Sequence, residues 1–196
     1  MPVSGEADVR IGLPGTDIDS AERFLKGQGR RHKGKILVGF GPGSKMQAKK
    51  WPIQRYYEVG KRLIKGYDVW PVIFGGHEDK VIGDELLTMW NRGYNAAGQL
   101  GLREAAAGLS KCKLYIGNDT GTMHLAASVS TSCVAIFSAR DLKGKWYPYG
   151  KGHMVFRKDV SCAGCQYETC DHNTCLIEIH VEDVVETAES KLEALS

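Results

Sequence analysis

The chain has 196 residues, enough for one full domain or two very small ones, and its 42% hydrophobic and 25% charged residues exclude a disordered or low-complexity chain. The net charge of +3 is too small to indicate a protein that binds nucleic acid or a membrane surface. The sequence has no apolar run of about 18 residues and no recognisable secretory signal. We therefore expect a cytoplasmic protein with no transmembrane segment, whose six cysteines are made in a reducing compartment.

The first segment of the chain, residues 1–34, is polar and rich in glycine. Asp17-Ile18-Asp19-Ser20 places acidic and hydroxyl side chains where a helix N-terminus favours them, and this predicts a short helix through Leu25. Gly27, Gly29 and the basic run 30–33 are typical of a solvated connection. We expect residues 1–34 to form a linker with one short helix.

From Lys35 onward, apolar runs alternate with helical patterns. Lys35–Phe40 and Val69–Phe74 are rich in branched residues and predict buried strands. Between them, apolar residues at helical spacing follow Pro52, and Gly66 is the predicted end of that helix. The next predicted helix has one apolar face, made of Val81, Ile82, Leu86, Met89 and Trp90.

The alternation continues to the end of the chain. The further predicted strands are Asn95–Ala97, Leu114–Ile116, Cys133–Phe137 and Met154–Phe156. The further predicted helices are Leu102–Ser110, Thr120–Ser130 and a final helix in residues 181–196, with an apolar stripe of Val181, Val184, Val185, Ala188, Leu192 and Leu195.

Strands that alternate with helices of this length indicate an α/β fold of the Rossmann-like class. In this class a parallel sheet has helices on both faces and right-handed crossovers. We expect one such domain over residues 35–180, including a cysteine-rich loop at 160–176, followed by the carboxyl-terminal helix. Ligands of open parallel sheets bind beyond the carboxyl ends of the strands, so the loops at that edge are the candidate site.

The most specific of these loops is Asn118–His124, which follows a strand and begins a helix. Asp119 or Thr120 can cap that helix, and Gly121 would let a ligand approach the backbone. His124 lies one turn further, on the same face as Thr120. A helix N-terminus offers free N–H groups and partial positive charge, which suit a diphosphate. The alternative is a capped core helix with a buried, hydrogen-bonded histidine.

Two other loops lie at the same predicted edge. Gly41-Pro42-Gly43-Ser44 is like a phosphate-binding turn but lacks the Gly-Lys-Ser/Thr ending of a P-loop, and Lys45, Lys49 and Lys50 follow it. The alternative is a surface turn with solvated lysines. In the loop after Phe74, Glu78 could accept hydrogen bonds from a ribose, or it could simply lie in the first turn of the next helix.

Four cysteines are spaced C-x2-C-x4-C-x4-C, at Cys162, Cys165, Cys170 and Cys175. Four thiolates could hold a structural Zn²⁺ ion tetrahedrally, but the usual pair of Cys-x-x-Cys knuckles is absent. We expect structural cysteines, reduced or disulfide-bonded, with no bound metal, and keep a structural zinc as the alternative. Cys112 and Cys133 have the pattern of ordinary buried thiols.

Taken together, the loops resemble a known family. Gly-Pro-Gly-Ser with Lys-Lys-Trp-Pro (41–52), Phe-Gly-Gly-His-Glu (74–78), Gly-Leu-Arg-Glu-Ala-Ala (101–106) and Gly-Asn-Asp-Thr-Gly-x-x-His-Leu-Ala-Ala (117–127) are similar to the carboxyl-terminal half of glycosyltransferase family 9. This is the group of ADP-heptose:lipopolysaccharide heptosyltransferases, which have the GT-B fold. The resemblance covers roughly residues 35–180.

The resemblance implies a site for a nucleotide-diphospho-sugar, with ADP-heptose as the leading donor and a lipopolysaccharide core-type acceptor. It implies contacts to the diphosphate and sugar from Ser44 and Lys49, and to the ribose from Glu78. The diphosphate and the sugar hydroxyls would be held by Asp119, Thr120, Gly121 and His124. It further implies that transfer needs no cofactor or bound metal, because a helix N-terminus and basic side chains neutralise the leaving diphosphate.

Enzymes of this family have a second, amino-terminal Rossmann-like domain, which binds the acceptor and supplies the proposed catalytic aspartate. The sequence shows no such domain, so we expect no catalytic base in this chain. The expected partners are the donor, a separate amino-terminal acceptor domain or a second copy of the chain, and a peripheral membrane acceptor, but no nucleic acid. The alternative function is a non-catalytic nucleotide-binding module; a GT-B-fold sugar epimerase is disfavoured.

Overall fold

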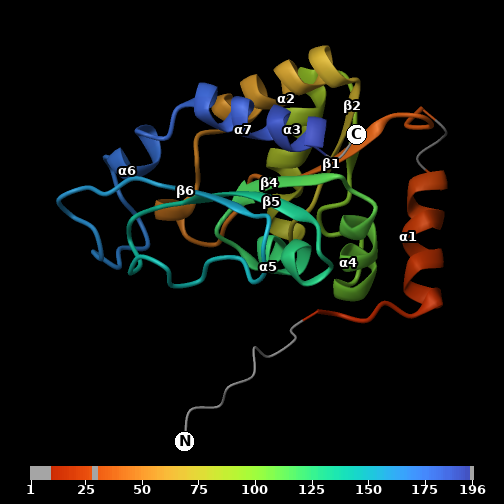
Figure 1. Cartoon of the computed structure of the whole chain (residues 1–196), viewed down its shortest axis with the longest axis horizontal. Helices are drawn as coiled ribbons and strands as arrows, with labels where there is room; N and C mark the ends of the chain where they lie inside the picture. Colours follow the sequence, from red (N-terminus) through yellow and green to blue (C-terminus); the bar gives the residue numbers. More distant parts are fainter. Residues whose placement is uncertain (1–9, 28–30, 195–196) are drawn as a thin grey trace, which may run out of the picture.

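The computed structural model describes residues 10–27 and 31–194. One six-stranded sheet runs through it in the order β3-β2-β1-β4-β5-β6, and every neighbouring pair is parallel (Figure 1). The strands are β1 (Ile36–Gly41), β2 (Val69–Ile73), β3 (Tyr94–Asn95), β4 (Leu114–Asn118), β5 (Ser132–Phe137) and β6 (Met154–Arg157). This order is that of a doubly wound Rossmann-like sheet, as predicted.

Helices cover both faces of the sheet, which confirms the predicted fold class. They are α1 (Gly15–Gly27), α2 (Ile53–Tyr67), α3 (Lys80–Trp90), α4 (Leu102–Ser110), α5 (Gly121–Ser128), α6 (Thr174–Ile177) and α7 (Val181–Ala194), with short 3-10 turns η1 (Gln47–Lys49) and η2 (His77–Asp79). In Figure 1, α2, α3 and α7 lie on one side of the sheet, and α4 and α5 lie on the other. The described part of the chain contains no helix that is long and apolar enough to cross a membrane.

Two apolar layers, one on each face of the sheet, form the core. In β4, Leu114 and Ile116 belong to the layer between the sheet and helices α2 and α7, whereas Tyr115 belongs to the layer between the sheet and helices α4 and α5. Successive side chains of a strand point to opposite faces, so a strand buried on both sides is apolar throughout. This is why each central strand is a continuous apolar run in the sequence.

The amino-terminal segment packs on the domain through α1. Ala21 and Leu25 of this helix are buried, and α1 lies against α4. His32 also contacts the domain, because its Nδ1 lies 2.8 Å from the Tyr94 hydroxyl. Residues 1–9 and 28–30 lie outside the described chain, as does Leu195 of the predicted final stripe. The division of the chain at residues 34 and 180 therefore stays a prediction.

The predicted end of the helix at Gly66 is wrong. Gly66 lies inside α2, which continues to Tyr67, and Asp68 then adopts a left-handed conformation with φ of 51°. The Asp68 carboxylate pairs with Lys35 and Arg92, so charged partners from two other segments stabilise the turn that ends the helix. The glycine at position 66 suggested the end of the helix, but the sequence did not show that Lys35 and Arg92 contact Asp68.

The predicted apolar face of α3 is wrong in part. Val81 is 78% exposed and Met89 is 39% exposed, whereas Leu86 and Trp90 are buried as expected. Trp90 packs directly over Gly60 of α2, where a Cβ would lie 2.3 Å from the indole ring. The face of α3 that packs on α2 is thus the one with Leu86 and Trp90, and Val81 and Met89 lie outside it.

Candidate functional site

A cavity of about 670 Å³ opens at the carboxyl edge of the sheet, between the loops that follow β1, β2 and β4. Of the predicted site residues, it is lined by Ser44, Lys49, Glu78, Asp119, Thr120 and Gly121. These residues come from three segments that are far apart in the sequence. The structure brings them together because the carboxyl ends of parallel strands meet at one edge of a sheet.

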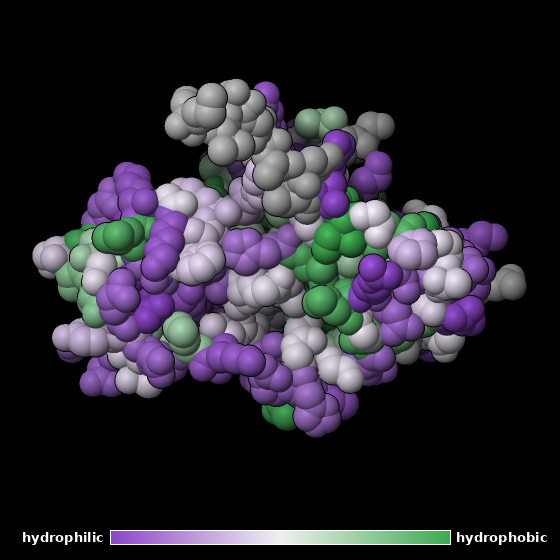
Figure 2. Space-filling model, turned by 90° about the horizontal axis from the view of Figure 1, so that it is seen from below, coloured by the Kyte–Doolittle hydropathy of each residue, from purple (hydrophilic) through white to green (hydrophobic). Residues whose placement is uncertain are grey.

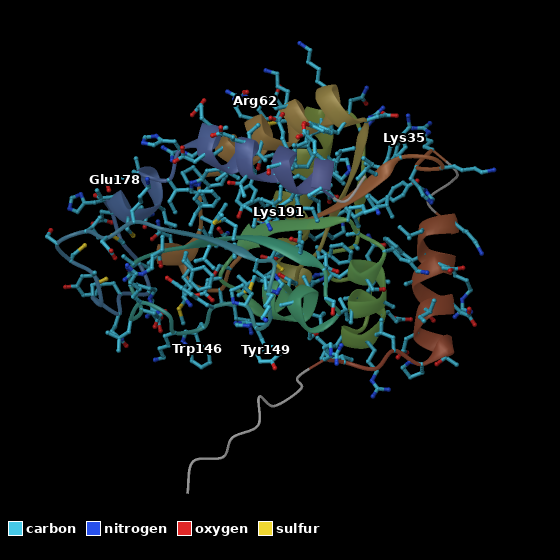
Figure 3. All side chains as sticks on the ribbon, viewed as in Figure 1. Lys35, Arg62, Trp146, Tyr149, Glu178 and Lys191 are labelled. Atoms are coloured by element: carbon cyan, nitrogen blue, oxygen red, sulfur yellow. The ribbon has the colours of Figure 1, made fainter. Side chains whose placement is uncertain are left out.

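His124 lies in a neighbouring cavity of about 410 Å³, which shares Leu102, Gly121 and Leu125 with the first. Its lining is mostly apolar and includes Ile11 and Tyr149. Figure 2 views the molecule from below and shows apolar surface within an otherwise largely polar face, and Figure 3 places Tyr149 at this lower edge. Of the predicted site residues, His124 alone does not line the first cavity and lies in this second one.

Asn118 connects two of the site loops through its fully buried side chain. Its amide nitrogen donates to the carbonyl of Pro42 at 2.7 Å. Its amide oxygen accepts from the backbone N–H of Trp51 at 3.2 Å and from the hydroxyl of Tyr56 at 2.9 Å. Asn118 thus holds the loop of residues 41–51 against the end of β4, and this is an architectural role rather than a ligand contact.

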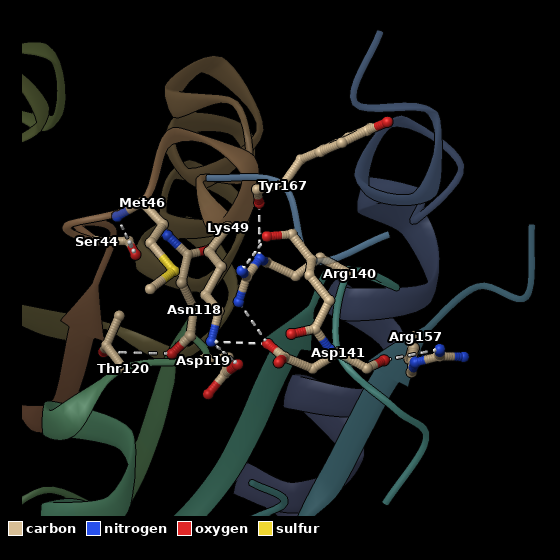
Figure 4. A network of polar contacts seen from close by, with 11 residues as sticks. Ser44, Met46, Lys49, Asn118, Asp119, Thr120, Arg140, Asp141, Arg157 and Tyr167 are labelled. Carbon is tan, nitrogen blue, oxygen red and sulfur yellow. Dashed lines mark hydrogen bonds and ion pairs between the residues drawn. The ribbon is translucent and has the colours of Figure 1, made fainter. Parts of the chain in front are cut away.

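Lys49 lies between two carboxylates (Figure 4). Its Nζ is 2.5 Å from Asp119 Oδ2 and 3.2 Å from Asp141 Oδ2, and its side chain is only 12% exposed. The interpretation of Lys49 as a solvated surface lysine is therefore wrong, whereas Lys45 and Lys50 are exposed. An ammonium group held at the wall of the cavity is well placed to meet an anion.

Burial and neighbouring charges shift the pKa values of Asp119, Asp141 and His124. Burial raises the pKa of Asp119, although the adjacent Lys49 opposes the shift. Burial would also raise the pKa of Asp141, but Lys49 and Arg140 together hold it below its usual value. Burial lowers the pKa of His124, against the influence of Asp119, so His124 is neutral near pH 7.

The first turn of α5 faces the cavity without a side-chain cap. Thr120 occupies the N-cap position in an extended conformation, but no side chain caps the helix by a hydrogen bond. The Asp119 carboxylate binds Lys49 instead, so the predicted capping bond is absent from this helix. The first N–H groups of a helix have no intrahelical partner, so they are available to a ligand in the cavity.

Glu78 lies in η2, before α3 begins, and lines the cavity. The adjacent Asp79 is a residue that the sequence analysis missed. Its carboxylate accepts the Gly76 N–H at 2.9 Å, and a Cβ on Gly43 would lie 1.8 Å from Asp79 Oδ1. Gly43 is therefore required in the first loop, because any side chain there would collide with the carboxyl group of Asp79. Burial raises the pKa of Asp79.

Arg140 and Asp141 were also missed. Both are buried, and both follow β5 at the same edge as the predicted loops. Their contacts are with distant segments and were not visible in the sequence.

Residues 160–176 are here called the cysteine segment. Its four cysteines are free thiols, as are Cys112 and Cys133. Within residues 10–27 and 31–194, no three His, Cys, Asp or Glu side chains gather in a way that could hold a metal ion. Cys112 and Cys133 are buried as predicted, and burial raises the pKa of each thiol to about 12.

A doubly wound parallel sheet with a cavity at its carboxyl edge places the chain in the Rossmann-like fold class. The sequence profile of glycosyltransferase family 9 (heptosyltransferase) matches residues 12–176. The chain therefore belongs to glycosyltransferase family 9, as the resemblance indicated.

Individual relatives agree with this assignment. The chain is 38% identical over 108 residues to lipopolysaccharide heptosyltransferase 2 of Salmonella typhimurium, a match that covers 52% of this chain and 30% of that protein. It superposes on the ADP-heptose lps heptosyltransferase II of E. coli with a TM-score of 0.76 and 25% identity, over 94% of this chain and 54% of that one. A family 9 glycosyl transferase from Veillonella parvula gives a TM-score of 0.78 at 25% identity, with the same coverage. The chain thus spans about half the length of the solved structures that it matches.

Proposed function

We propose that this chain binds a nucleotide-diphospho-sugar in the cavity at the carboxyl edge and acts as the donor-binding half of a glycosyltransferase. The observation that carries the proposal is the open space beside Gly121. A Cβ there would touch nothing within 4 Å, and the backbone φ is not left-handed, so the fold itself does not require a glycine. A diphosphate seated against the first turn of α5 would account for it.

The cavity wall offers chemically distinct groups to such a donor. Lys49 would bind the diphosphate, together with the first N–H groups of α5. Asp119, a carboxylate that can only accept hydrogen bonds when ionised, would bind sugar hydroxyls, and Glu78 would do the same for the ribose. Ser44 and Thr120 supply hydroxyls at the rim, while His124 would reach the sugar from the neighbouring cavity. Positive charge from Lys49 and the helix N-terminus would stabilise the leaving diphosphate without a metal ion.

ADP-heptose is the proposed donor and a lipopolysaccharide core-type molecule the proposed acceptor. Support comes from the E. coli relative, whose name specifies ADP-heptose and lps, and from the curated lipopolysaccharide heptosyltransferase of Salmonella typhimurium. With such an acceptor, transfer would take place at the cytoplasmic surface of a membrane. Isothermal titration of the chain with ADP-heptose, ADP, UDP and GDP tests the donor. We expect ADP-heptose to bind and ADP to bind more tightly than UDP or GDP.

Two further results would decide between the proposed functions. Donor at about 100 times its dissociation constant should raise the unfolding free energy by about 2.7 kcal/mol, and a failure of every nucleotide to do so would contradict the donor site. Transfer additionally needs an acceptor hydroxyl to be positioned and deprotonated, which can lower the barrier by roughly 7–11 kcal/mol and more. We therefore expect turnover only when a heptosyltransferase amino-terminal domain is supplied. Binding without turnover under both conditions would favour the non-catalytic module.

A further inference from the structure

We propose that Asp141 and Arg140 are positioning residues of the donor site. Asp141 holds the Lys49 ammonium group at the cavity wall, and Arg140 fixes Asp141 to the cysteine segment. This inference rests on the function proposed above and adds to it, because neither residue was expected from the sequence and neither lines the cavity.

The first step is the position of the Lys49 ammonium group. An ammonium group has three N–H donors, and the carboxylates of Asp119 and Asp141 each take one, at 2.5 and 3.2 Å. Lys49 and Asp119 line the cavity, whereas Asp141 is not among its described lining residues. Asp141 therefore contacts Lys49 from the protein side and leaves the third N–H for a ligand.

The second step is the fixed orientation of Asp141. Arg140 donates from Nη1 to Asp141 Oδ2 at 2.9 Å, and both side chains are at least nine-tenths buried. Its other guanidinium nitrogens donate to the carbonyl of Tyr167 at 2.7 Å and the carbonyl of Gln166 at 2.6 Å. Because the guanidinium group is a planar fork, three such contacts leave it one orientation (Figure 4).

The third step is that the cysteine segment also holds the turn that carries Lys49. The N–H of Ala48 donates to the carbonyl of Glu168 at 2.9 Å. The side-chain oxygen of Gln47 accepts the N–H of Cys170 at 2.8 Å. The cysteine segment therefore sets the position of Lys49 twice, through the backbone of η1 and through the chain of contacts from Arg140 to Asp141.

The charges show why removal of Asp141 should disturb ligand binding. Lys49 and Arg140 are balanced by Asp119 and Asp141 in a buried cluster, and burial makes an unpaired charge costly. Without the Asp141 carboxylate, Lys49 would pair with Asp119 alone, and Arg140 would lose the carboxylate that it pairs with. The ammonium group would then lose its defined position relative to a bound diphosphate.

The experiment is a double-mutant cycle read by isothermal titration with ADP and, as a ligand without phosphate, adenosine. Asp141→Asn should weaken ADP binding about tenfold, the loss expected for one hydrogen bond to a charged group, and leave adenosine binding unchanged. In a Lys49→Met background, Asp141→Asn should have no further effect on ADP. The matched control is Lys143→Met, in the same loop as Asp141. This variant breaks an exposed ion pair with Asp159 and should bind ADP like the wild type.

Several outcomes would overturn the inference. Wild-type or tighter ADP affinity in Asp141→Asn would show that the carboxylate does not position Lys49, and an equal loss for adenosine or in the Lys49→Met background would indicate a general structural role. If Asp141→Asn does not fold, Arg140→Lys reports on the same contacts and should weaken ADP selectively. A failure of both variants to fold would assign the network to stability alone. Absence of ADP binding by the wild type would instead contradict the proposed function itself.

Discussion

The side-chain oxygen of Asn118 accepts a hydrogen bond from the hydroxyl of Tyr56 at 2.9 Å, and both side chains are completely buried. Tyr56 lies in α2 and Asn118 ends β4, so this contact joins a helix on one face of the sheet to the edge where the cavity opens. The same amide group binds Pro42 and Trp51. This one buried amide therefore ties the first site loop to the end of β4 and to α2.

Replacing Asn118 with alanine should lower the unfolding free energy by about 3 kcal/mol, because buried polar groups of Pro42, Trp51 and Tyr56 would lose their partner. Urea denaturation followed by circular dichroism measures this. Gln54→Ala, on the exposed side of α2, is the control and should change stability little. A loss well below 1 kcal/mol for Asn118→Ala would show that water replaces the amide at no cost.

Gly121→Ala should separate binding from stability. The new Cβ meets open space and the backbone conformation suits alanine, so the unfolding free energy should be unchanged or rise by up to about 1 kcal/mol. ADP binding should weaken, because the methyl group would occupy the space proposed for the diphosphate. Thermal denaturation and calorimetric titration of the same preparation measure the two effects. Retention of full ADP affinity would place the diphosphate elsewhere.

Two glycines of α2 should respond to the same substitution with opposite signs. Gly66→Ala adds a Cβ in open space within a helix and should stabilise the protein by up to about 1 kcal/mol. Gly60→Ala places a Cβ 2.3 Å from the ring of Trp90 and should destabilise it by about 1–3 kcal/mol. Chemical denaturation of both variants measures the difference. Equal effects would contradict the close packing of α2 on α3.

Stability should fall at mildly acid pH in part because of His124. Its pKa in the folded protein is lowered by burial, so the unfolded chain takes up the proton first as the pH drops below about 6.5. In that window the unfolded state binds more protons, and the unfolding free energy therefore decreases with decreasing pH. His124→Gln should show a smaller decrease between about pH 7.5 and about pH 5.5 than the wild type.

The control for His124→Gln is His172→Gln, which removes an exposed histidine. The unfolding free energy of both variants is measured at both pH values. This variant should retain the wild-type pH dependence. If His124→Gln has the same dependence as the wild type, then the imidazole of His124 is as easily protonated in the folded protein as in the unfolded one.

Much of the fold could be predicted from the sequence because its elements depend on local patterns. The continuous apolar runs of the strands predict burial on both faces, and α4 begins and ends at the predicted residues Leu102 and Ser110. The cavity was predictable for a related reason. Once the strands are parallel, the loops that carry Ser44, Glu78 and Asp119 must lie at one edge.

The sequence by itself therefore determined the class of fold, the family and the edge of the sheet where the cavity opens. Only the tertiary structure decided which side chains meet there. Lys49 and Asp119 are 70 positions apart, and Asp141, which also pairs with Lys49, lies in yet another loop; the cysteine segment contacts the loops of both Lys49 and Asp141. Periodicity and turn signals report on neighbours along the chain, whereas an ion pair in a cavity wall depends on the packing of several distant segments against each other.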